Sequence, residues 1–244
     1  MRTSTVLPRS AVALTVLAAL FLTGCAEQGE RRPASPTASD TPTPGSGPAA
    51  ARPTADVRIE ATNSSMLGQS FHASGTTTAF PGATQETWSD PRQGLHMKVT
   101  GQVSGDIYCK DGTSYTSAPL LAAALRQRGQ SLTVPDRLLD TYVTSTTVSG
   151  CDMYYRIPET VQAAPAQDRV IDGKRASAFE TPAGSTQDVY FLEDGKLRLI
   201  QVESSRAGRT STTTYDAFGE KYSIEMPAAQ KTMTMEQFRA AVNG

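Results

Sequence analysis

The sequence predicts an α+β domain in which one curved antiparallel β-sheet is packed by helices on one face. Short segments of alternating polar and apolar residues recur along 70–117 and again along 170–226. Turn signals such as Asp-Gly separate many of them, as in meandering antiparallel strands. A strongly helix-forming stretch interrupts the series after residue 117. Strands on both sides of a helical insert are typical of a single sheet with helices on one side.

The first half reads as a weak helix followed by strands. Residues 56–67 form the expected helix. The segment 94–100 alternates most cleanly, with Leu95, Met97 and Val99 facing one way and His96 and Lys98 the other. The expected strands are 70–80, 84–90, 94–100, 106–110 and 112–117.

The helical insert is expected to be a hairpin of two helices. Ser117 can cap the first, Pro119 suits its first turn, and Gly129 follows its end. A second helix is expected after Pro135, because four apolar residues there share one side of a helix. These residues are Leu138, Leu139, Tyr142 and Val143.

Strands resume in the second half, with turns at Asp172-Gly173 and Asp194-Gly195. Thr234 and Gln237 have the spacing of a capping box, which predicts a final helix. The expected strands are 170–171, 174–181, 185–192, 196–205, 209–215 and 222–226.

The N-terminus has the features of an export signal. Arg2 and Arg9 are followed by an apolar run at 11–22, which is too short to span a bilayer but suits a signal-peptide core. Leu22-Thr23-Gly24-Cys25 resembles the lipobox of bacterial lipoproteins. The resemblance implies that residues 1–24 are a signal peptide and that Cys25 carries acyl chains such as palmitate. The expected location is therefore the extracytoplasmic face of the cell membrane, through a lipid anchor.

The next segment is expected to be a tether. Residues 25–55 hold six prolines and lack large apolar side chains, so they cannot bury enough surface to fold. The folded domain is then 56–244, a length that suits one domain with its own core. It carries 18 basic and 21 acidic residues without a basic block, which makes nucleic acid an unsuitable partner.

Two cysteines remain once Cys25 is set aside. Cys109 and Cys151 lie outside the cytoplasm in this interpretation, where an isolated pair is expected to be oxidised. A redox or metal pair is the alternative, but the spacing is not CxxC and no histidine is nearby.

The closing segment carries a family resemblance. Tyr215-Asp216-Ala217-Phe218-Gly219 is followed by Ile224-Glu225-Met226-Pro227. With the lipobox, the tether and the interrupted meander, this resembles actinobacterial lipoproteins of the LolA/LppX/LprG-like type. The resemblance implies a half-barrel whose concave face, covered by helices, forms an apolar cavity for acyl chains, with a role in envelope lipid transport. The Cys109–Cys151 pair is not general in that superfamily.

Apolar strand and helix residues are the candidates for the cavity lining, because acyl chains need an apolar wall and few polar anchors. The alternative is that they pack on each other as a closed core. The candidates are Leu95, Met97, Val99, Ile107, Leu121, Leu125, Leu138, Tyr142, Val189, Phe191, Leu197 and Leu199.

The alternatives to a lipid-binding protein are an enzyme and an interaction module. An enzyme is disfavoured because the sequence holds none of the common catalytic motifs, and His72 and His96 both fall in expected strands as solvated face residues. No catalytic residue, metal site or cofactor is therefore expected. The second class is an interaction or regulatory module of the cell surface with a collapsed cavity, which would contact a membrane-protein partner.

Overall fold

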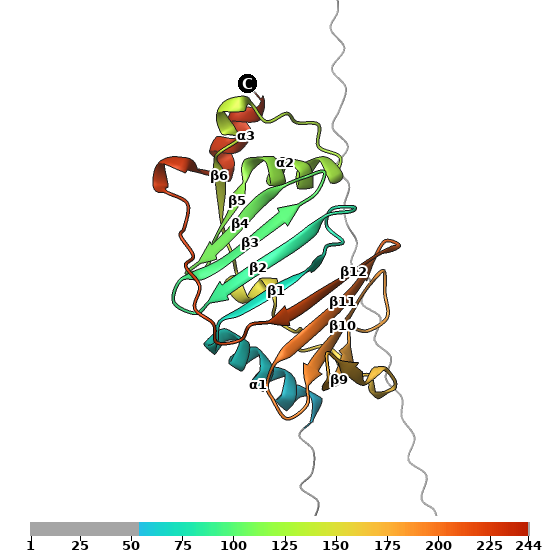
Figure 1. Cartoon of the computed structure of the whole chain (residues 1–244). Helices are drawn as coiled ribbons and strands as arrows, with labels where there is room; N and C mark the ends of the chain where they lie inside the picture. The colour runs from blue at the N-terminus through green and yellow to red at the C-terminus, as the bar shows by residue number, and fades with distance from the viewer. Residues whose placement is uncertain (1–53, 244) are drawn as a thin grey trace, which may run out of the picture. The chain divides into compact units, whose positions relative to one another are not determined.

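The computed structural model describes residues 54–243, which form an α+β domain (Figure 1). In this range thirteen strands make one sheet in the order β13-β6-β5-β4-β3-β2-β1-β12-β11-β10-β9-β7, with β8 also paired to β9. The pairs are antiparallel, apart from the parallel pair of β13 and β6. The strands are β1 Phe71–Thr76, β2 Thr84–Asp90, β3 Gly94–Thr100, β4 Gly105–Lys110, β5 Thr113–Ser117, β6 Tyr142–Thr146, β7 Gln162–Ala163, β8 Arg169–Ile171, β9 Lys174–Glu180, β10 Thr186–Glu193, β11 Leu199–Arg206, β12 Arg209–Asp216 and β13 Thr232–Thr234.

Helices are few and short in the described range. They are α1 Ala55–Gly68, α2 Ala118–Gln127 and α3 Met235–Asn243, with 3-10 turns η1 Asp136–Leu138, η2 Cys151–Tyr154, η3 Pro165–Gln167 and η4 Ala229–Lys231. Among the described helices, none combines the length and hydropathy needed to cross a bilayer.

The sheet has two distinct faces. The register places Phe71, Leu95 and Cys109 on one side, which we call the helix face. There α1 packs through Ile59 and Met66, and α2 packs through Leu120 and Ala123. We call the other side the open face. Because side chains alternate along a strand, each strand contributes to both faces.

The sheet consists of two halves joined by the pairing of β1 with β12. Strands β1 to β5 follow one another directly, β6 adds after α2, and β9 to β12 form the second half. Figure 1 shows that the second half runs in a different direction, so the sheet bends at the junction. Gly75 lies at this junction. An added Cβ there would meet the backbone carbonyl oxygen of Thr212 at 1.9 Å, so the close approach requires glycine.

Several sequence predictions of structure are confirmed. β2 and β3 have the expected bounds, and α1 and α2 begin and end within a residue or so of expectation. The capping box of α3 is present: the Thr234 N–H donates to Gln237 Oε1 at 2.8 Å, and the Gln237 N–H donates to Thr234 Oγ1 at 3.2 Å.

The second helix of the expected hairpin is wrong. Only the short turn η1 follows Pro135, and Tyr142 and Val143 belong to strand β6. The stretch Val143-Thr144-Ser145-Thr146 is rich in β-branched residues, which favours a strand, and Val143 packs against α2 and Phe238 as part of the sheet. The four apolar residues have helical spacing in the sequence, but Leu138 and Leu139 lie in and just after η1, and Tyr142 and Val143 begin β6.

The expected strand at 222–226 is also wrong, because these residues have no regular structure. Their backbone is bonded to a side chain instead of a neighbouring strand. Gln93 donates from Nε2 to the Tyr222 carbonyl at 2.5 Å and accepts from the Ile224 N–H at 2.9 Å. The side-chain amide of Gln93 therefore pairs with a carbonyl and an N–H that would pair with a neighbouring strand if 222–226 were a strand.

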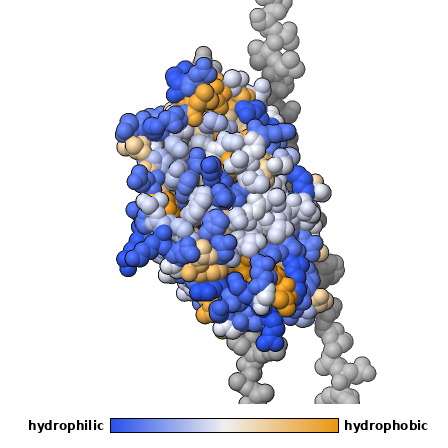
Figure 2. All heavy atoms as spheres, viewed as in Figure 1, coloured by the Kyte–Doolittle hydropathy of each residue, from blue (hydrophilic) through white to orange (hydrophobic). Residues whose placement is uncertain are grey.

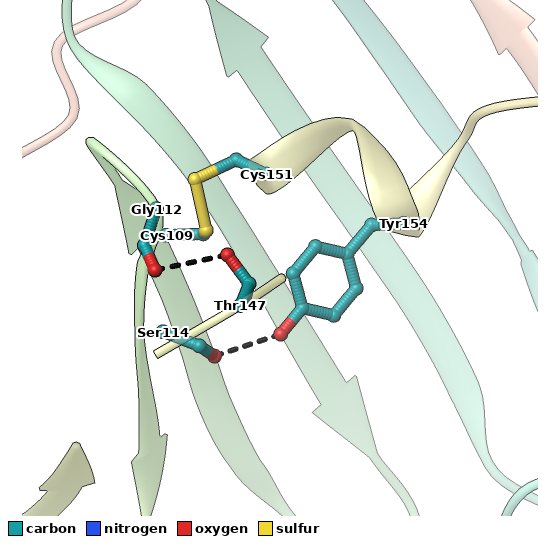
Figure 3. The surroundings of a disulfide bond; sticks show 6 residues. All are labelled: Cys109, Gly112, Ser114, Thr147, Cys151 and Tyr154. Atoms are coloured by element: carbon teal, nitrogen blue, oxygen red, sulfur yellow. Dashed lines mark hydrogen bonds between the residues drawn. A yellow bond between two sulfur atoms is a disulfide. The ribbon is translucent and has the colours of Figure 1, made fainter. Parts of the chain in front are cut away.

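The disulfide Cys109–Cys151 is present, and it joins β4 to η2 (Figure 3). It therefore attaches the irregular segment after β6 to the helix face of the sheet. Beside it, the hydroxyls of Tyr154 and Ser114 are hydrogen-bonded at 2.7 Å. Figure 3 shows the Tyr154 ring lying over the strands next to the sulfur atoms.

A candidate binding hollow on the helix face

A hollow of about 310 Å³ opens on the helix face where the two halves of the sheet meet. Strands β10, β11 and β12 form one wall, and the chain from Thr76 to Ala79 forms another. The segment after the disulfide, from Met153 to Arg156, covers part of it. The hollow therefore depends on the bend between the halves and on the segment that the disulfide holds.

One wall is largely aromatic. Tyr155, Tyr190 and Tyr215 line the hollow together with Val202. Behind them Phe71 packs against the Tyr155 ring edge-on, with centroids 4.9 Å apart, and against Tyr215 at 5.6 Å. This wall is rigid and mainly apolar, as ring contacts of this kind are in protein cores.

The polar wall lies farther along the same three strands, β10, β11 and β12. Arg206 donates to the Asp188 carboxylate, with its Nη2 2.8 Å from Oδ2 and 3.2 Å from Oδ1. The Arg206 side chain is 48 % exposed, so its guanidinium also faces solvent. Ser204, Ser211 and Thr213 complete this wall. The hollow is thus amphipathic, with aromatic rings on one side and a charged pair with hydroxyls on the other.

The tyrosine hydroxyls remain protonated well beyond neutral pH. Burial raises the pKa of Tyr155 to about 12, and the charge of Asp152 adds to the effect. Burial also raises the pKa of Tyr190 and of Tyr215 well above the ordinary value of a phenol. These rings therefore carry neutral O–H groups at neutral pH.

A second hollow of about 210 Å³ lies on the far side of Tyr155. Leu67 of α1, Leu95 of β3 and Cys151 are among its lining residues, with Arg92 and Lys110. Tyr155 is the residue that lines both hollows.

The expected lining residues, all within residues 54–243, lie outside the first hollow. Leu95, Met97, Val99 and Leu199 are on the helix face as expected but are buried in contacts with other side chains. Ile107 lies between the clusters that contain Val99 and Leu95.

Three helix and turn residues from the same set, Leu121, Leu125 and Leu138, pack in the cluster around α2 and Phe238. Leu197 is 48 % exposed in the turn between β10 and β11. The buried members of the set pack against other side chains, and Leu95 also lines the second hollow.

Three residues of the expected set lie on the opposite side of the sheet. Val189 and Phe191 pack with Ile171 and Ile200 beneath the segment that carries η3 and β8. Strand β10 is buried on both faces over 188–193, so alternation could not assign a face. Tyr142 falls on the open face because it belongs to a strand, and its ring packs edge-on against Tyr108.

The residues that do line the hollow were missed because most of them are polar. Thr213 stands in a threonine-rich stretch of the sequence, and Tyr190 lies between two apolar residues. The signal that could have found them is the alternation of Ser211, Thr213 and Tyr215 along β12, which places them on one face.

The two histidines lie on the open face, and each is paired with a carboxylate. His72 Nδ1 is 2.8 Å from Asp216, and His96 Nε2 is 2.8 Å from Asp106. Trp88 lies between the two imidazoles. Within 54–243 no group of three or more His, Cys, Asp or Glu side chains could hold a metal ion.

The surface over the sheet is mainly hydrophilic to neutral in the view of Figure 2, and hydrophobic atoms form small separate groups there. This view therefore shows no continuous hydrophobic patch over the sheet.

Comparisons with known proteins give similarity at the level of solved structures. No family model and no curated protein matches the chain. LprF from Mycobacterium bovis is 13 % identical, with 71 % of this chain and 97 % of that chain covered and a TM-score of 0.38. The lipoprotein LppX from Mycobacterium tuberculosis is 12 % identical, with 70 % and 97 % covered and a TM-score of 0.42. A LolA superfamily protein from Nitrosomonas europaea is 9 % identical, with 71 % and 95 % covered and a TM-score of 0.31. At these values the similarity concerns the general arrangement of the chain, and the function is argued from this chain's own residues.

Proposed function

We propose that the domain is a non-enzymatic binding module of the cell envelope whose helix-face hollow takes one amphipathic ligand, an acyl chain with a polar head. The observation that carries this proposal is the pairing of an aromatic wall, Tyr155, Tyr190 and Tyr215, with a polar wall that holds Arg206 and Asp188. An apolar chain gains from contact with the rings, and a polar head group can remain beside the charged pair.

The size of the hollow favours a single chain. A volume of about 310 Å³ lies at the lower end of the roughly 300–1,000 Å³ typical of small-molecule sites. The multi-chain lipid cargo that an apolar half-barrel would suggest needs more space. A carrier or sensor of single-chain amphiphiles fits the hollow better.

Anchoring to the membrane is part of the same proposal. Cys25 and residues 1–24 lie outside the described residues, so the anchor rests on the lipobox resemblance. A lipid on Cys25 would hold the domain close to a bilayer, which is a source of single-chain amphiphiles.

The anchor is tested by fractionation of cells that express the Cys25→Ser variant. The parent chain is expected in the membrane fraction, and the variant is expected to leave it because no thiol remains for acylation. A control with Ala26→Ser keeps the thiol and should stay with the membrane. Equal distribution of the parent and Cys25→Ser chains would rule out the anchor.

Ligand binding in the first hollow is tested by a substitution that fills the hollow with a larger side chain. Ser204 of β11 lines the first hollow, whereas the next residue, Ser205, faces the other side of the sheet. In the mature chain carrying Cys25→Ser, Ser204→Trp is expected to weaken binding of octanoate at least tenfold, because the indole occupies the space of the ligand. Isothermal titration calorimetry measures the change.

Ser205→Trp is the matched control, since it adds the same side chain one position along the same strand. It should bind octanoate like the parent. Equal loss in both variants, or an absence of binding in the parent itself, would count against the hollow as a ligand site. The second outcome would favour the interaction module with a protein partner.

A further inference from the structure

The two hollows on the helix face are separated by one side chain. Tyr155 lines the first hollow with Tyr190 and Val202, and it lines the second with Leu67 and Leu95. It also packs against both of the hydrophobic clusters that meet there, one around Phe71 and one around Cys109. The ring is therefore a partition between two cavities in one stretch of the sheet.

Phe71 of β1 lies against this partition, with its ring centroid 4.9 Å from that of Tyr155. On the same face, Ala73 and Gly75 follow along β1, and Thr87 and Ser89 of β2 lie opposite Ala73 and Phe71. Ala73, Thr87 and Ser89 are small and buried. Tyr155 is the residue that lines both hollows, so its ring lies where a connection between them would run.

The backbone around Tyr155 is held on both sides. Before it, Cys151 is bonded to Cys109 and the Tyr154 hydroxyl pairs with Ser114. After it, the Asn63 side chain accepts from the Ile157 N–H at 2.9 Å and donates to the Ile157 carbonyl at 2.8 Å. With the backbone attached on both sides, the Tyr155 side chain is the part of this segment that can turn.

We infer that Tyr155 is the gate that sets the length of acyl chain the domain accepts. This inference rests on the proposed function. A short chain fills the first hollow alone, whereas a longer chain extends into the second hollow, against Leu67 and Leu95, once the ring has turned away. The chemical class of ligand is a single-chain amphiphile, and Tyr155 determines its preferred length.

The experiment compares octanoate with palmitate, each below its micelle concentration, in the mature chain carrying Cys25→Ser. Tyr155→Ala is expected to raise the ratio of palmitate affinity to octanoate affinity at least tenfold over that of the parent, because octanoate loses a ring of the first hollow while palmitate gains the second hollow. The long chain gains because it no longer has to displace the ring, and each additional buried methylene strengthens binding. Tyr155→Phe keeps the ring without the hydroxyl and should retain the chain-length preference of the parent.

A second variant guards against loss of the fold. Tyr155→Leu keeps an apolar side chain against Phe71 but removes most of the partition, and it should shift the preference in the same direction as Tyr155→Ala. If octanoate binds but neither variant changes the ratio of the two affinities, the gate is excluded and the binding hollow stands. If neither acid binds to the parent or to the variants, the proposed function fails and the gate fails with it.

Discussion

Replacing Gly75 by alanine is expected to lower the free energy of unfolding by about 3 kcal/mol, in the upper part of the range for overpacked sites. The new Cβ would lie 1.9 Å from the Thr212 carbonyl oxygen and 2.8 Å from the Thr213 Cα. Both are backbone atoms, so relief requires β1 and β12 to separate. These strands join the two halves of the sheet, and the first hollow lies beside them.

Urea unfolding followed by circular dichroism measures this effect, and Gly68→Ala provides the control. Gly68 is the last residue of α1, and an added Cβ there would have no heavy atom within 4 Å. That variant should be as stable as the parent or slightly more so, since alanine favours a helix over glycine. Equal midpoints for the two variants would show that the junction tolerates a side chain.

Removal of the disulfide by the double substitution Cys109→Ala and Cys151→Ala is expected to lower the free energy of unfolding by about 4 kcal/mol. The bond closes a loop between residues 42 positions apart, and its absence returns that conformational freedom to the unfolded chain. For a domain of this size, the loss corresponds to a decrease of roughly 8–16 °C in the melting temperature.

Differential scanning calorimetry with and without a reductant tests this. The parent should melt at the lower temperature of the double variant when it is reduced, and the variant should not respond to the reductant. A parent that melts at the same temperature in both conditions would contradict a stabilising role for the bond.

The elements that the sequence predicts best are those with one buried face and one exposed face. β3 alternates between Leu95, Met97 and Val99 and their polar neighbours, so its bounds followed from the pattern. The α3 capping box and the Cys109–Cys151 pair were predictable because each depends on two residues of defined chemistry. Features that depend on one local pattern, or on one pair of residues, can therefore be predicted from a single sequence.

The missed features depend on contacts between distant segments. The pattern after Pro135 predicts a helix, but the segment from Tyr142 forms β6. Val143 packs against elements that are distant in the sequence and that no local pattern identifies. β10 is buried on both sides, so Phe191 could not be assigned to a face. A search for apolar residues also could not find the hollow, because serines and threonines make up much of its lining.

The parallel pairing of β13 with β6 has a consequence for the order of folding. Thr144 of β6 donates its hydroxyl to the carbonyl of Met233, 89 positions later in the chain. Until the segment that carries β13 has been synthesised, the backbone edge of β6 has no partner on that side, and an unpaired edge can recruit another chain. Contacts across such a long separation also form slowly. The nascent domain is therefore most exposed to aggregation in the interval before its last strand arrives.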